Sequence, residues 1–170
     1  MGVLRQVVLA LIVLKMAPES LHAATAQGFG VSDFFNGATV ANMRHKVEGF
    51  YAPDCVFEDP LVRIEGRERI VAYYQSLYKD LTQIRFEFTS ELRQGDEGFA
   101  AWIMHINTPN LRSGQTVSVP GASQFRFLAD KVTYHRDYFD LGAMVYEHIP
   151  VVGWLTRRIK ARLALGVPQS

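Results

Sequence analysis

Residues 131–141 read Lys-Val-Thr-Tyr-His-Arg-Asp-Tyr-Phe-Asp-Leu, a run rich in aromatic and β-branched residues that predicts a strand. The side chains of a strand alternate between its two faces, so one face is expected to carry Thr133, His135, Asp137 and Phe139. A carboxylate two residues from an imidazole, among aromatic side chains, suits proton transfer in a half-apolar cavity. Surface ion pairs on an edge strand explain the same residues, and the spacing alone leaves both interpretations open.

Three more strands are predicted before this one. Period-two alternation covers residues 84–92, and two further strands are expected over 99–107 and 116–128. Short turns separate these strands, so the four together are expected to form an antiparallel meander. Gly121 in the third strand suggests a bulge or a bend.

Helical patterns precede the meander. A helical segment begins near Val31, and a second is expected from an N-cap at Thr39 until Pro53 prevents its continuation. A short strand follows over 55–59. The next helix opens at 66–70 and carries an apolar stripe made by Ile70, Tyr73, Tyr74, Leu77 and Tyr78. Helices followed by a run of strands indicate an α+β fold with the helices packed on one face of the sheet.

The composition limits the function. The 170 residues, 48% of them hydrophobic, suit one globular domain, and a net charge of +1 gives no reason to expect nucleic acid as a partner. Cys55 is the only cysteine, so neither an internal disulfide nor a cysteine-based metal site is expected. The five histidines have no His-Glu-x-x-His spacing, and no glycine-rich phosphate loop occurs, so no metal or cofactor is predicted.

The two ends of the chain are interpreted apart from the domain. Residues 1–30 are an N-terminal extension or a signal segment, which would leave the protein cytoplasmic in the first case and exported or periplasmic in the second. Residues 142–170 form a helical tail. A helix is expected over 141–149 until Pro150 breaks it, and the last helix carries four cations, no acid and an apolar stripe made by Val151, Leu155, Ile159 and Leu163. That helix is expected either to dock on the body of the protein or to contact an anionic membrane, and docking is the favoured interpretation.

Three motifs carry a resemblance to a known superfamily. They are 51–60 (Tyr-Ala-Pro-Asp-Cys-Val-Phe-Glu-Asp-Pro), 66–70 (Gly-Arg-Glu-Arg-Ile) and 136–140 (Arg-Asp-Tyr-Phe-Asp). Residues 31–141 resemble the nuclear transport factor 2-like superfamily, which includes ketosteroid isomerase, SnoaL-like cyclases and limonene-1,2-epoxide hydrolase. The resemblance implies a cone-shaped, curved antiparallel sheet with N-terminal helices on its concave face, a pocket between the layers and a homodimer.

The resemblance also implies roles for single residues. Asp59 matches the general base of ketosteroid isomerase, but Phe35 and Ser123 stand where that enzyme has its oxyanion-hole Tyr and Asp. Asp137 matches the aspartate that activates water in limonene-1,2-epoxide hydrolase, with Phe57 and Asp59 in place of a Tyr and an Asn. Met104 and Ile106 replace the pair that protonates the epoxide, so epoxide opening would need another proton donor, such as His135.

Two functions are therefore predicted for one apolar pocket. In the first, an enzyme of isomerase, cyclase or hydrolase type binds a hydrophobic small molecule, with Asp59, Asp137 and His135 as catalytic residues. The residues expected to contact the substrate are Phe35, Phe57, Trp102, Met104, Ile106, Ser123, Phe125 and Phe139. In the second, the same pocket holds a ligand without catalysis, or the fold serves as a dimerisation module.

Overall fold

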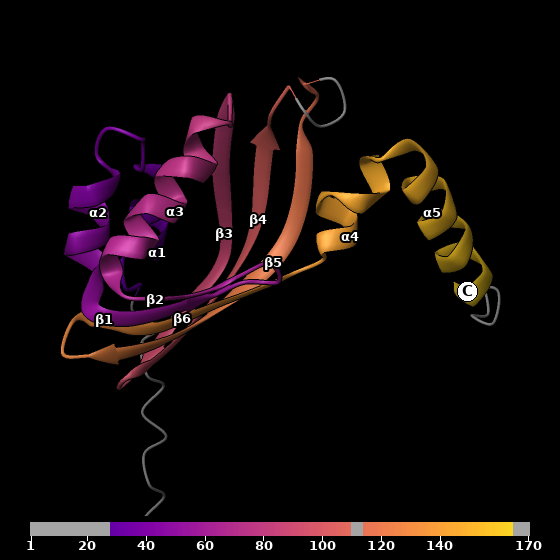
Figure 1. Ribbon diagram of the computed structural model, residues 1–170. Helices are drawn as coiled ribbons and strands as arrows, with labels where there is room; N and C mark the ends of the chain where they lie inside the picture. Colours follow the sequence, from indigo (N-terminus) through magenta and orange to yellow (C-terminus); the bar gives the residue numbers. More distant parts are fainter. Residues whose placement is uncertain (1–27, 110–113, 165–170) are drawn as a thin grey trace, which may run out of the picture.

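The computed structural model describes residues 28–109 and 114–164, and residues 1–27 of the predicted extension or signal segment lie outside this range. Within the described residues the fold is a six-stranded curved sheet with strand order β2-β1-β6-β5-β4-β3. Helices α1, α2 and α3 lie on the same side of this sheet, and a helical tail follows it (Figure 1). The strands are β1 (Tyr51–Glu58), β2 (Arg63–Glu65), β3 (Gln83–Gln94), β4 (Glu97–Asn107), β5 (Val117–Leu128) and β6 (Lys131–Phe139). The helices are α1 (Val31–Asn36), α2 (Met43–Phe50), α3 (Arg67–Lys79), α4 (Leu141–Met144), the 3-10 turn η2 (Tyr146–His148) and α5 (Pro150–Ala164).

The predicted α+β fold is confirmed. Strands β3, β4, β5 and β6 pair with their neighbours in antiparallel register, as a meander requires. Strand β1 adds to β6 in parallel register, and the short strand β2, which was not predicted, pairs with β1. The sheet is therefore mixed, because β6 runs between one antiparallel and one parallel partner.

A bulge at Thr89 changes which side chains of β3 face the helices. Phe88 pairs with Trp102 and Ser90 with Ala101, so Thr89 is left without a cross-strand partner. The alternation predicted across 84–92 is therefore wrong beyond this point, because an inserted residue reverses the faces of the residues that follow. Glu91, predicted on the wet face, accepts backbone hydrogen bonds from Phe29 and Val31 at the start of the described chain.

A second bulge lies at Thr133 in β6. Arg126 of β5 pairs with Tyr134, whereas Phe127 pairs with Val132. Thr133 therefore does not share a face with His135, contrary to the prediction, and Val132 takes the core position instead, fully buried. Beyond the bulge the prediction holds, because Asp137 and Phe139 are on the same face as His135.

The N-terminal helices close one side of the core. Helix α2 begins at Met43, and its N-cap Asn42 lies three residues after the predicted N-cap, because Thr39 and Asn42 hydrogen bond to each other's backbone in a turn before the helix. The chain passes directly from α2 into β1, and Pro53 lies in an irregular part of that strand between Tyr51 and Val56. Aromatic side chains dominate the space between the helices and the sheet, with Phe34 stacked on Phe50 at 4.7 Å.

The helical tail differs from its prediction in two ways. The helix expected over 141–149 is divided into α4 and η2, and Pro150 begins α5, a position where its missing N–H removes no helical hydrogen bond. The predicted docking of α5 through its apolar stripe is not seen. That helix stands away from the sheet (Figure 1), and Gly153 is its only buried described residue.

Candidate functional site

A cavity lies between α3 and the concave face of the sheet. It has a volume of about 120 Å³, and a single buried water needs only roughly 10–15 Å³, so a small organic molecule has room there. Its wall is mostly aromatic and aliphatic. The lining residues are Phe35, Phe57, Asp59, Leu61, Tyr73, Tyr74, Leu77, Tyr78, Leu81, Ile84, Phe86, Trp102, Met104, Ile106, Asp137, Phe139 and Met144.

Asp137 is held by two buried donors. The hydroxyl of Ser123 donates to its Oδ1 at 2.5 Å, and His135 Nε2 lies 2.8 Å from the same oxygen. Ser123 is in turn positioned by Trp102, whose indole N–H donates to its hydroxyl oxygen at 2.8 Å. Ser123 is directly opposite Asp137 across the β5–β6 ladder, so the sheet register itself brings these two side chains together.

His135 connects Asp137 to two tyrosines in the core. Its Nδ1 lies 2.6 Å from the hydroxyl of Tyr51, and that hydroxyl lies 3.0 Å from the hydroxyl of Tyr74. With an ionised Asp137, Nε2 must donate to the carboxylate, so Nδ1 of a neutral imidazole accepts from Tyr51. Burial strongly raises the pKa of both Tyr51 and Tyr74, so each keeps its proton and can donate along this chain.

The second oxygen of Asp137 is different. Among the residues that the structure describes, none hydrogen bonds to its Oδ2, although the side chain lines the cavity and is 15% exposed. An ionised carboxylate with one oxygen fixed by two donors and the other directed to an apolar space can accept a proton from a bound molecule. This is the one cavity-facing carboxylate oxygen with no protein partner in the described part of the chain.

Asp59 is anchored more completely. Its Oδ1 accepts hydrogen bonds from the backbone N–H groups of Leu61 and Val62, at 2.6 and 2.8 Å. Its Oδ2 accepts from the hydroxyl of Tyr73 at 2.5 Å. Burial, followed by this hydrogen bond, raises the pKa of Tyr73, which keeps the tyrosine protonated. Asp59 therefore reaches the cavity as a pair with Tyr73, and the same carboxylate shapes the turn that leads to β2.

The structure separates the predicted contact residues into two groups. Six of them line the cavity: Phe35, Phe57, Trp102, Met104, Ile106 and Phe139. Ser123, Phe125 and His135 are fully buried and do not line the cavity, so the contact of Ser123 and Phe125 with a substrate stays a prediction. Phe125 stacks on the imidazole of His135 at 4.3 Å between ring centroids, so its role is to hold the histidine.

Helix α3 supplies a wall that the sequence analysis did not assign to the site. Tyr73, Tyr74, Leu77 and Tyr78 belong to the stripe recognised at helical spacing, but that stripe was interpreted as core. The three tyrosine hydroxyl groups could have indicated that this stripe borders a cavity. A helix face buried only against apolar side chains rarely carries three tyrosines, because buried hydroxyl groups need hydrogen-bond partners. Other lining residues that were missed come from loops, from β3 and from α4, among them Leu61, Leu81, Ile84, Phe86 and Met144.

Gly121 serves the site through close packing. The β4–β5 register is unbroken there, so the predicted bulge is absent. The indole of Trp102 lies directly over Gly121, and a β-carbon at this position would overlap the ring. Glycine therefore lets Trp102 reach Ser123 while its ring forms part of the cavity wall.

In residues 28–109 and 114–164, no group of three or more His, Cys, Asp or Glu side chains is arranged to hold a metal ion. The cavity wall holds two carboxylates, Asp59 and Asp137, among apolar side chains and three tyrosines of α3.

Comparison with known proteins gives a family match. The sequence profile of the SnoaL-like domain family matches residues 31–135. None of the curated proteins compared with the sequence matches it.

Solved structures share the fold at low sequence identity. An epoxide hydrolase from Mycobacterium tuberculosis, similar to limonene-1,2-epoxide hydrolase, is 17% identical with a TM-score of 0.56, over 74% of this chain and 92% of that one. A protein with a ketosteroid isomerase-like fold from Catenulispora acidiphila, in complex with trimethylamine, is 18% identical with a TM-score of 0.56, over 64% and 86%. An NTF2-like protein of unknown function from Burkholderia pseudomallei is 14% identical with a TM-score of 0.54, over 60% and 82%.

Proposed function

This chain belongs to the SnoaL-like domain family, within the nuclear transport factor 2-like superfamily, and we propose that it binds a hydrophobic small molecule and transforms it by carboxylate acid/base chemistry. The observation that carries the proposal is the asymmetry of Asp137. One oxygen is fixed by Ser123 and His135, the other has no partner in the described chain, and the residue lines an apolar cavity.

In the proposed reaction Asp137 is the base. Its Oδ2 removes a proton from an acidic C–H or from a water next to the substrate. The two donors on Oδ1 stabilise the carboxylate before the reaction, and charge-assisted hydrogen bonds of this kind are about twice as strong as neutral ones. His135 does not contact the substrate, because it is buried behind the wall, so we assign it to orienting and stabilising Asp137.

The pair of Asp59 and Tyr73 has the complementary role. The substrate is apolar over most of its surface, and its polar group is placed near the hydroxyl of Tyr73, the partner of Asp59 at 2.5 Å. The proton that Asp137 takes up is returned to the substrate at another atom, so that the enzyme ends each turnover unchanged. Isomerisation, ring closure and hydration all follow this pattern.

The alternative is a binding module in which the cavity holds a ligand without changing it. The observation in its favour is that both oxygens of Asp59 are already occupied by the turn and by Tyr73. The two functions differ in what Asp137 contributes, because a binding module needs its apolar wall but has no use for a free carboxylate oxygen.

The test uses 5-nitrobenzisoxazole, a small apolar molecule whose C–H proton is removed by a base as its N–O bond breaks, which gives a coloured phenolate. Binding is followed by quenching of Trp102 fluorescence in a Trp154→Phe background, so that only the cavity tryptophan reports. We expect turnover that falls by about 100-fold or more in Asp137→Asn, the usual contribution of a positioned base. Asp130→Asn removes an exposed carboxylate next to β6 and is the matched control.

The outcomes separate the two functions. Retained binding with lost turnover in Asp137→Asn supports the acid/base proposal, provided that Asp130→Asn behaves like the unmodified chain. Equal turnover in both variants would reject Asp137 as the base. Binding without turnover in the unmodified chain would favour the binding module.

A further inference from the structure

Helix α5 leaves its apolar side chains uncovered. Trp154, Leu155 and Ile159 are 56%, 50% and 52% exposed, and Val151 and Leu163 at the two ends are more exposed still. Val151, Leu155, Ile159 and Leu163 formed the predicted stripe that was expected to dock on the body of the protein. An exposed apolar row of this length on a helix indicates a surface that binds another protein or a membrane.

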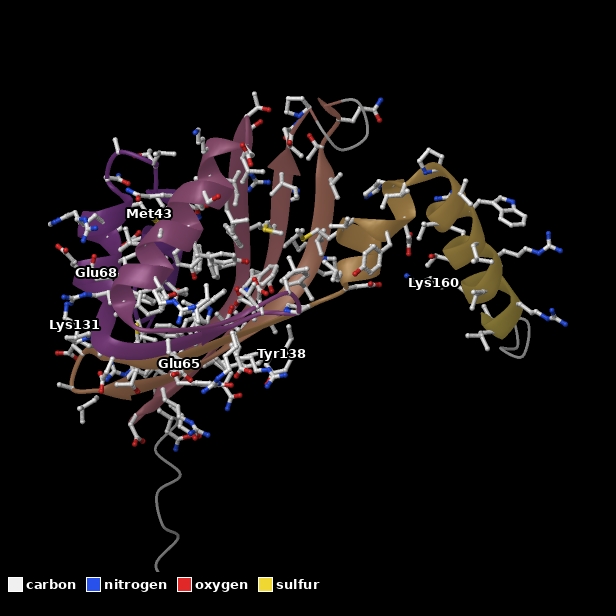
Figure 2. All side chains as sticks on the ribbon, viewed as in Figure 1. Met43, Glu65, Glu68, Lys131, Tyr138 and Lys160 are labelled. Carbon is white, nitrogen blue, oxygen red and sulfur yellow. The ribbon has the colours of Figure 1, made fainter. Side chains whose placement is uncertain are left out.

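The opposite side of α5 attaches the helix to the rest of the chain. Gly153 is buried against the backbone of Glu147, and Arg157 donates to the carbonyl oxygen of Glu147 at 2.8 Å. Lys160 binds Asp140 at 3.0 Å and also pairs with Glu147, and it points from α5 back toward α4 (Figure 2). The orientation of α5 is therefore fixed by one side, and the other side faces outward.

Two cations belong to the outward side. At 100° per residue, Arg158 and Arg162 fall within the arc that runs from Trp154 through Val151 and Leu155 to Ile159. Within residues 28–109 and 114–164, no carboxylate pairs with either arginine, and Arg158 instead lies over the ring of Trp154 at 5.4 Å. The helix carries no acidic residue at all. Its exposed surface thus combines apolar side chains, a tryptophan and two uncompensated positive charges.

We propose that α5 docks this protein on an anionic membrane surface, with the helix lying in the plane of the interface. Apolar side chains would enter the boundary between headgroups and acyl chains, and the arginines would contact lipid phosphates or carboxylates. Trp154 has the amphipathic ring that favours this depth. The 15 residues of α5 are fewer than the ~20 that a spanning helix needs, and none of the described helices is both long and apolar enough to cross a bilayer.

A second copy of the chain fits this surface less well. A symmetric contact through α5 would place Arg158 and Arg162 of both protomers in one interface, where the helix has no acidic residue to pair with them. Like charges brought together in an interface are unfavourable. A negatively charged lipid surface can take up the apolar side chains of the helix and also pair with its two arginines. The charge pattern, rather than the apolar row alone, is what selects the membrane.

The experiment is flotation of the full chain with vesicles of phosphatidylcholine alone, or of three parts phosphatidylcholine to one part phosphatidylserine. We expect binding to the mixed vesicles that weakens as salt is raised, with a blue shift of tryptophan emission that Trp154→Phe abolishes. Each basic residue near such a surface corresponds to about fivefold in partitioning, so Arg158→Gln with Arg162→Gln should lower binding by about 25-fold.

Two further variants make the result specific. Arg63→Gln with Arg85→Gln removes the same charge from exposed sites on β2 and β3 and should change binding only a few-fold. Leu155→Ser with Ile159→Ser should abolish binding while the circular dichroism spectrum stays unchanged. Equal loss in both arginine pairs, or absence of binding to the mixed vesicles, would overturn the proposal. So would self-association that Leu155→Ser with Ile159→Ser prevents, without any binding to vesicles.

Discussion

The hydroxyl of Tyr51 lies 2.6 Å from Nδ1 of His135, and both side chains are fully buried although 84 positions separate them in sequence. This contact determines which nitrogen of the imidazole faces Asp137. A histidine whose Nδ1 accepts from tyrosine has to donate through Nε2, which is the arrangement that keeps a negative carboxylate stable at the edge of the cavity.

Tyr51→Phe is therefore expected to lower both stability and turnover. The change leaves His135 Nδ1 and the Tyr74 hydroxyl without their buried partner, which should reduce the free energy of unfolding by about 1–3 kcal/mol in urea titrations. Tyr138→Phe removes a hydroxyl from the outer face of the sheet and should stay within about 0.5 kcal/mol of the unmodified chain. Similar losses in both variants would show that the buried contact has no special role.

Asp59 should prove to have a structural and a chemical role that two substitutions can separate. Asp59→Ala leaves the N–H groups of Leu61 and Val62 without an acceptor, and we expect a loss of about 1–3 kcal/mol. Asp59→Asn keeps the acceptor for these groups but changes the partner of Tyr73, so its melting temperature should remain close to that of the unmodified chain. Its turnover of 5-nitrobenzisoxazole should nevertheless fall. Full activity in Asp59→Asn would assign Asp59 to the turn alone.

Hydrolysis of limonene oxide should be slow. Met104 and Ile106 line the cavity at the positions where an acid-supplying pair would be needed, and neither can give a proton to the epoxide oxygen. A positioned acid contributes about 100-fold or more, so rates should be lower than those of a dedicated epoxide hydrolase by at least that factor. Gas chromatography of the diol product measures this directly, and rapid turnover would mean that another group of the cavity wall, such as Tyr73, replaces the missing donor.

Cys55 should resist thiol reagents until the protein unfolds. Burial raises the pKa of its thiol from 9.0 to about 11, so at pH 8 roughly one thiol in a thousand is ionised, and the thiolate is the reactive form. Because the folded pKa is the higher one, the neutral thiol favours folding below pH 9, and this contribution is lost as the pH rises through 11. Labelling with a disulfide reagent in buffer and in 8 M urea compares the two states, and fast labelling in buffer would show that β1 opens readily.

The predicted homodimer should form through the outer face of the sheet. Leu92, Phe99 and Tyr138 are half-exposed there and line one shallow depression, and Tyr138 points away from α1, α2 and α3 (Figure 2). Phe99→Glu places a carboxylate in that depression and should shift sedimentation toward the monomer. Leu128→Glu makes the same change at a more exposed residue outside it and should leave the dimer intact. A monomeric unmodified chain would refute this prediction.

The sequence was most informative where the chain is regular. The meander, the α+β order and the cavity positions of Asp59 and Asp137 follow from alternation and from the resemblance, and six of the eight predicted contact residues line the wall. The bulges at Thr89 and Thr133 could not be predicted, because each is a single inserted residue that no turn signal marks. Each changes the faces on one side of it relative to the other, which is why Glu91, after the first bulge, and Val132, before the second, were assigned to the wrong side.

Contacts between residues far apart in the sequence could not be predicted either. The contact of Tyr51 with His135 depends on the parallel pairing of β1 and β6, which local periodicity cannot show. The stripe of α3 was recognised, but periodicity does not distinguish a helix face buried in the core from one that borders a cavity. For α5 the pattern correctly predicted an amphipathic helix. Whether the rest of the fold covers the apolar side of that helix cannot be predicted from the pattern.

Different elements of the fold supply the hydrogen-bonded groups around Asp137 and most of the apolar cavity wall, and this affects how the sequences of related proteins can diverge. The proton-transfer groups depend on β5 and β6, whereas much of the apolar wall comes from α3, β3 and β4. A lineage could exchange Leu77 or Met104 for another apolar residue of similar volume at a cost usually below about 1.5 kcal/mol. The substrate range would then drift while the hydrogen bonds around Asp137 stayed the same, so related chains can inherit one chemistry and apply it to different molecules.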